Sequence, residues 1–181
     1  MSLARDKLLA DMLAGQLSTK VDGVPDAARM REVMSGRSQL TPRERTAVLL
    51  SPQARLDYLD MRDEHLSSIT RTWSNEKIDR VLVAKAAASL SSEMTIKGRD
   101  YTVTVFSEDL PTVRWWINIA LGPRISKTLG SMVGVRLIDS GGLVWLTGKP
   151  TVEGHLSHVW SHEDVSPMER AAQYRLILEP C

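Results

Sequence analysis

The stretch MVGVRLIDSGGLVWLTGKPTVEGHLSHVW, residues 132–160, decides the fold expected for this chain. Two runs rich in β-forming residues, 133–137 and 143–147, flank the turn sequence Asp139-Ser-Gly-Gly. A Gly-Lys-Pro corner then leads to a third run, 155–160. Glycine-rich turns between such runs are typical of antiparallel hairpins. The stretch therefore predicts a three-strand unit in which the glycines form the corners.

Further strand patterns lie on both sides of this unit. In residues 101–106 apolar and polar side chains alternate, as in an antiparallel strand with one buried face. The expected strands span residues 94–97, 101–106, 113–121, 132–138, 143–147, 155–160 and 173–179. About seven short strands separated by turn signals predict an antiparallel β-sandwich.

The first half of the chain is instead predicted to be helical, with four or five helices. Apolar residues three and four positions apart, among them Leu13 and Leu17, indicate an amphipathic first helix. Thr41-Pro42-Arg43-Glu44 has the spacing of a capping box, and Ser51-Pro52 opens a longer helix. We expect Leu56, Leu59, Leu66 and Ile69 to form its buried stripe. Residues 78–85 favour a further helix, although Val81-Leu82-Val83 also suits a strand.

The composition changes at the small polar segment 89–92, which predicts an α+β protein of two domains, 1–88 helical and 93–181 β-rich. Residues 1–88 hold 14 basic and 12 acidic residues, and the whole chain has a formal net charge of +1. This balance argues against direct nucleic-acid binding. With a single cysteine, Cys181, and no long apolar run, we expect a cytoplasmic protein without disulfides or a membrane span.

No pattern in the sequence predicts a catalytic, cofactor or metal site. His155 and His158 lie an odd number of positions apart on one expected strand, so their side chains point to opposite faces. For the same reason Trp115 and Trp116 face opposite sides, one toward the core and one toward the helical half or a partner. Trp145 and Trp160 are expected to fill the sandwich.

The β-rich half resembles the transthyretin-like, carboxypeptidase-regulatory type of small sandwich. The resemblance rests on three segments: Val135-Arg-Leu-Ile-Asp-Ser-Gly-Gly142, Gly148-Lys-Pro-Thr-Val-Glu-Gly154 and Tyr174-Arg-Leu-Ile-Leu178. It covers about a quarter of the chain and departs from the family pattern at Val152. It implies an adhesion, sensing or docking module and not a catalyst.

The helical half is similar in layout to the sigma-binding regions of bacterial anti-sigma factors. Leu9-Ala-Asp-Met-Leu-Ala-Gly-Gln-Leu17 and Ser51-Pro-Gln-Ala-Arg-Leu56 carry this resemblance. It implies a non-enzymatic, zinc-free regulator that sequesters a transcription factor, plausibly a sigma factor, through its helical half. Methionines offer an adaptable apolar surface, and the acidic helix face suits a basic partner. The expected partner-binding residues are Leu13, Leu17, Met30, Met34, Asp57, Asp60, Asp63, Trp115 and Trp116.

Two alternatives remain open at this stage. One is an adaptor or structural subunit of a larger protein assembly. The other is a small hydrolase or carbohydrate-binding protein, which requires a pocket where His155 or His158 meets a carboxylate and a tryptophan. For any single methionine, packing inside a helical bundle is a slightly better interpretation of the pattern than a binding role.

Overall fold

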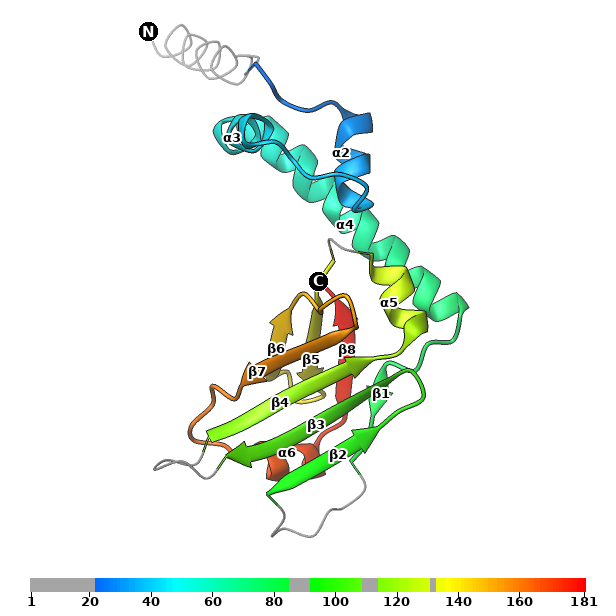
Figure 1. The fold of residues 1–181 in the computed structure, drawn as a ribbon, viewed down its shortest axis with the longest axis vertical. Coiled ribbons are helices and arrows are strands. Elements are labelled where there is room, and N and C mark those ends of the chain that lie inside the picture. The colour runs from blue at the N-terminus through cyan, green and yellow to red at the C-terminus, as the bar shows by residue number, and fades with distance from the viewer. Residues whose placement is uncertain (1–21, 85–91, 109–113, 131–132) are drawn as a thin grey trace, which may run out of the picture. The chain divides into compact units, whose positions relative to one another are not determined.

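The computed structural model describes residues 22–84, 92–108, 114–130 and 133–181, and Figure 1 shows its fold. The chain divides into two compact units, Met1–His65 and Leu66–Cys181. Three described helices precede the first strand, and the strands form two antiparallel sheets, so the α+β class predicted from sequence is confirmed. Leu13 and Leu17 lie outside the described residues.

Side-chain caps mark the starts of α2 and α3, and the cap of α3 is the one predicted from sequence. Helix α2 spans Ala27–Met34, and the side chain of Asp26 accepts a hydrogen bond from Arg29 N. Helix α3 spans Pro42–Leu50, and Thr41 and Glu44 form both bonds of the expected capping box. Helix α4 spans Pro52–Asn75, so it begins in the first unit and ends in the second.

The core of the first unit is small. Met30, Val48 and Ala54 are buried, and Leu40, Tyr58 and Met61 pack against them. Ala54, Tyr58 and Met61 lie three and four positions apart and therefore share one side of α4. The buried stripe predicted for this helix is corrected at Leu56 and Leu59, which lie on the opposite side and are exposed, whereas Leu66 and Ile69 do pack in the second unit.

The described residues of the second unit form eight strands in two four-stranded antiparallel sheets, drawn one behind the other in Figure 1. One sheet has the order β1-β8-β5-β6 and the other β2-β3-β4-β7. The strands are β1 Val81–Leu82, β2 Glu93–Lys97, β3 Tyr101–Glu108, β4 Arg114–Leu121, β5 Val135–Asp139, β6 Val144–Gly148, β7 His155–Val159 and β8 Leu176–Pro180.

Three features of this unit differ from the sequence-based expectation. The helix predicted for 78–85 is wrong where the structure describes it, because α4 ends at Asn75 and Val81–Leu82 pairs with β8. Strand β7 pairs with β4 and not with β6, so the chain changes sheet at the Gly-Lys-Pro corner. Two short helices, α5 Pro123–Leu129 and α6 Pro167–Gln173, connect strands.

One buried cluster takes inward-facing side chains from both sheets and from the end of α4. Trp73, at that end, is fully buried, and its Nε1 donates to Thr128 Oγ1 of α5 at 2.6 Å. The core therefore includes residues before 89, which explains why the two units divide inside α4 and not at the composition change predicted as the domain boundary.

Two buried carboxylates tie the loops of the second unit together. Asp139, 1% exposed, accepts bonds from Leu143 N, Trp145 Nε1 and Arg170. Asp100, 4% exposed, accepts from Asp79 N at 2.8 Å and Arg124 Nη1 at 3.0 Å. In both cases burial raises the pKa, but the hydrogen bonds and arginines outweigh it, so the net pKa lies below the ordinary 3.8.

Candidate protein-binding face of the helical unit

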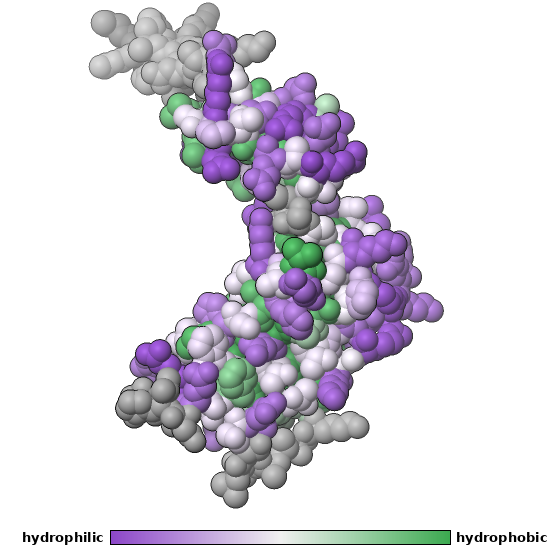
Figure 2. Space-filling model, viewed as in Figure 1, coloured by the Kyte–Doolittle hydropathy of each residue, from purple (hydrophilic) through white to green (hydrophobic). Residues whose placement is uncertain are grey.

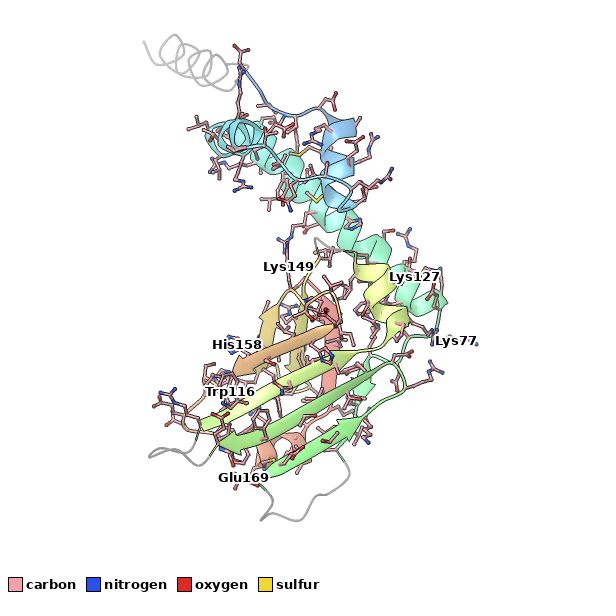
Figure 3. All side chains as sticks on the ribbon, viewed as in Figure 1. Lys77, Trp116, Lys127, Lys149, His158 and Glu169 are labelled. Atoms are coloured by element: carbon pink, nitrogen blue, oxygen red, sulfur yellow. The ribbon has the colours of Figure 1, made fainter. Side chains whose placement is uncertain are left out.

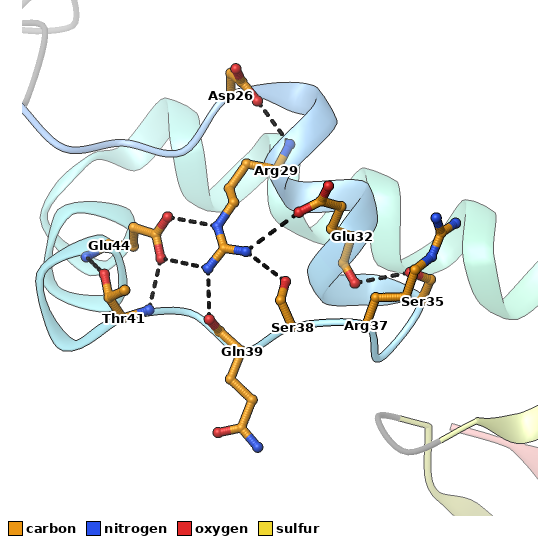
Figure 4. Close-up of polar contacts among 9 residues, drawn as sticks. All are labelled: Asp26, Arg29, Glu32, Ser35, Arg37, Ser38, Gln39, Thr41 and Glu44. Atoms are coloured by element: carbon orange, nitrogen blue, oxygen red, sulfur yellow. Dashed lines mark hydrogen bonds and ion pairs between the residues drawn. The ribbon is translucent and has the colours of Figure 1, made fainter.

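Arg29 fixes the arrangement of α2 and the start of α3. Its Nε donates to Glu44 Oε1 at 2.9 Å, its Nη1 to Ser38 Oγ at 2.6 Å and its Nη2 to Gln39 O at 2.8 Å (Figure 4). Bonds from Arg29 and from Thr41 N lower the pKa of Glu44 from 4.5 to about 2. Since one guanidinium bonds to two residues of the loop 35–41 and to Glu44 of α3, the short helices keep a defined geometry on a small core.

Four large leucines of this unit remain exposed. Leu49 and Leu50 at the end of α3 are 63% and 67% exposed, and Leu56 and Leu59 on α4 are 56% and 46% exposed. Figure 2 shows apolar side chains among hydrophilic ones on the visible face of the unit. Single exposed leucines are common, but four within eleven residues are an unusual concentration of exposed apolar side chains. We call Leu49, Leu50, Leu56 and Leu59 the leucine face.

Carboxylates accompany the leucines on α4. The predicted acidic residues Asp57, Asp60 and Asp63 are all exposed. Helical spacing places Asp60 and Asp63 on the same side as Leu56 and Leu59. Residues 52–64 contain four carboxylates and two guanidiniums, so this segment carries a local charge of −2. The carboxylates are Asp57, Asp60, Asp63 and Glu64, and the guanidiniums are Arg55 and Arg62. The outer side of α4 is therefore both apolar and acidic.

The predicted methionines do not belong to this surface. Met30 is 2% exposed and Met34 is 9% exposed, because both lie on the buried side of α2. Met30 packs in the core of the helical unit with Val48 and Ala54. Their side chains therefore offer little accessible surface, and their assignment as partner-binding residues stays a prediction.

Trp115 and Trp116 lie half-buried on β4, which Figure 3 shows for Trp116. Trp115 packs against the core, whereas Trp116 stacks on Phe106 across the strand pair with ring centroids 6.5 Å apart. Their opposite orientation agrees with the alternation expected of a strand. The buried Nε1 of Trp116 has no hydrogen-bond partner in the described structure. Both lie in the second unit, whereas the other described residues predicted to bind a partner lie in the first unit.

The histidines do not assemble the pocket that a hydrolase or sugar-binding site requires. His155 and His158 are exposed on β7 (Figure 3 labels His158), and the His158 ring contacts the carbonyl of its neighbour Val159. Trp145 and Trp160 are buried, as predicted, and contact each other edge to face with ring centroids 5.0 Å apart. Among the described residues, no group of three His, Cys, Asp or Glu side chains is arranged to hold a metal ion.

Sequence reasoning missed the leucine face. Leu49 and Leu50 are adjacent in a nine-residue helix whose buried residues are Ala47 and Val48, so four consecutive apolar residues already required some to be exposed. Leu56 and Leu59 were assigned to the core because they share a three-residue spacing, but Ala54, Tyr58 and Met61 form a competing stripe on the other side.

Comparison of the chain with family models, curated proteins and solved structures finds no match. None of the described helices is long and apolar enough to cross a membrane. Function is therefore inferred from the geometry of the site.

Proposed function

We propose that this chain is a non-enzymatic regulatory protein that binds another protein through its helical unit. The observation that carries the proposal is the leucine face, of which Leu56 and Leu59 share one side of α4 with Asp60 and Asp63. Apolar side chains at the centre of an interface supply affinity, and charges around them select the partner. A partner with an apolar groove or helix bordered by basic residues fits this surface.

The more specific form of the proposal is an anti-sigma-like inhibitor that sequesters a transcription factor in a bacterial cytoplasm. Its support is the sequence layout of the helical half together with the acidic charge on α4, since an acidic face competes well for a basic, nucleic-acid-binding surface. We infer that the two sheets form the predicted β-sandwich and act as a scaffold or docking module, because one core draws side chains from both.

Affinity capture from the native host tests the proposal with matched variants of the full chain. The face variants are Leu56→Ser/Leu59→Ser and Asp60→Lys/Asp63→Lys. The control is Val152→Ser, which removes another exposed apolar side chain, 98% exposed, in the second unit. We expect wild type and control to capture the same transcription regulator. The leucine variant should lose it, and the charge variant should bind it more weakly at low salt.

The captured protein is then purified and titrated against each variant by calorimetry. Loss of one central apolar anchor weakens an interface by on the order of tenfold or more. Equal affinity of wild type and the leucine variant, with both folded by circular dichroism, would contradict the proposal. Capture of assembly subunits in place of a regulator would favour the adaptor alternative.

A further inference from the structure

The two sheets of the second unit have four edge strands, and an edge strand presents unpaired N–H and C=O groups to any strand that can reach it. The edges are β6 and β1 in one sheet and β7 and β2 in the other. Natural sheets usually block such edges, so an unblocked edge is a candidate site for pairing with another strand.

Side chains block two of the edges. On β7, His155 N bonds to Thr151 Oγ1, Thr151 N bonds to His155 O, and His158 Nδ1 lies 2.6 Å from Val159 O. On β6, His162 Nε2 lies 2.9 Å from Val144 O. A third edge, β1, has only two residues. These three edges offer little to an additional strand.

Strand β2 differs from the other edges. Ser107 N bonds to Ser92 O, and Gly98 N bonds to Tyr101 O, which fixes the alternation of the β2–β3 ladder. Residues 94 and 96 exchange bonds with β3, so residues 93, 95 and 97 direct their backbone groups away from β3. No described residue bonds to the outward backbone groups of Thr95 or Lys97.

The sequence of β2 is complementary to itself in the antiparallel direction. If two copies of Glu93-Met-Thr-Ile-Lys97 pair about a two-fold axis at Thr95, Glu93 of each copy lies opposite Lys97 of the other. Met94 and Ile96, 6% and 4% exposed, then meet across the axis on the core side. Opposite charges directly across a strand pair stabilise it, and like charges destabilise it.

We propose that β2 is a self-association interface through which two copies of this chain join their β2-β3-β4-β7 sheets into one continuous antiparallel sheet. The pairing is isologous, since each copy contributes the same residues. A five-residue strand covers less area than a standard interface, so the dimer is weak and concentration-dependent. This interface lies in the second unit and does not depend on the proposed function of the leucine face.

Charge exchange on the full chain tests the pairing. Sedimentation velocity is measured from about 1 μM to about 1 mM, a range that covers weak association. Glu93→Lys places lysine opposite Lys97 at both ends of the pair, and Lys97→Glu places glutamate opposite Glu93. Each change should weaken dimerisation by on the order of tenfold. The double variant E93K/K97E should dimerise like wild type, and a mixture of the two single variants should form the heterodimer.

A proline variant tests the use of the open edge itself. Thr95→Pro removes an N–H that points away from β3, so the β2–β3 ladder is kept while dimerisation is lost. Ser157→Pro makes the matching change on the blocked β7 edge and should leave dimerisation unchanged. The proposal is overturned if wild type stays monomeric over the whole range, if folded T95P dimerises like wild type, or if the mixed single variants fail to associate.

Discussion

The two units of this chain are stabilised in different ways. The second unit has a core made of side chains from both sheets. It also buries two carboxylates, Asp100 and Asp139, each surrounded by hydrogen-bond donors. The first unit has a small core around Met30 and Val48 and keeps its charged cluster, Arg29 and Glu44, near the surface. The first unit also leaves four leucines exposed. This difference is what the proposed function requires, with the second unit as a scaffold and the first unit as the binding unit.

The largest effect is expected where the second unit depends on a buried charge. Asp139→Asn places an amide NH₂ where Trp145 Nε1 and Arg170 now donate, and leaves the guanidinium without its counter-charge. Removing one partner of a buried pair costs about 3–5 kcal/mol of unfolding free energy. Urea unfolding measures this loss of unfolding free energy. The control Glu179→Gln breaks the exposed pair with Arg136 and should cost about 0–1 kcal/mol; similar losses in both variants would contradict the contrast.

Acid should destabilise the second unit by a smaller amount through the same carboxyl groups. The folded pKa values of Asp100 and Asp139 lie below the ordinary 3.8. Their stabilisation is therefore fully present above pH 4 and is lost as pH falls through the folded pKa values. Urea unfolding at pH 7, 4 and 3 should show that the unfolding free energy falls with pH, and that it falls less in Asp139→Asn than in wild type. An equal fall of the unfolding free energy in both proteins would refute the contribution of Asp139.

The smallest effects on stability are expected within the first unit, where a buried and an exposed side chain are compared. Val48→Ala removes buried methyl groups and should cost about 2 kcal/mol. Leu56→Ala removes a larger but exposed side chain and should change stability by less than about 0.5 kcal/mol. Thermal unfolding followed by far-UV circular dichroism compares the two. An equal loss in L56A would mean that the leucine face supports the fold.

Elements with a local chemical signal could be predicted from the sequence. The capping box at Thr41 and Glu44 starts α3 as expected, and the glycine turn after Asp139 separates β5 from β6. Glu169 follows the helix cap Ser166 by three residues, so α6 had a comparable signal that was not used. Prediction failed where tertiary contacts decide the structure. Strand β1 exists because Val81 pairs with Ile177 and Leu82 with Leu176 of β8, 96 and 94 residues further along the chain.

The candidate site was predicted only in part, for a related reason. Charge is visible in the sequence, so Asp57, Asp60 and Asp63 were correctly expected on the surface. Which apolar residues a helix buries depends on the competing stripe around Ala54 and Met61, and spacing alone assigned Leu56 and Leu59 to the wrong side. Partner binding by these residues stays a prediction.

The position of Trp73 has a spectroscopic consequence. All five tryptophans, at positions 73, 115, 116, 145 and 160, belong to the second unit, and the first unit, Met1–His65, contains none. Trp73 is fully buried with its indole N–H bonded to Thr128, so its fluorescence should shift to the red when the β-rich unit opens. Tryptophan emission thus reports the scaffold alone, and the helical unit can lose or gain a partner without altering that signal directly.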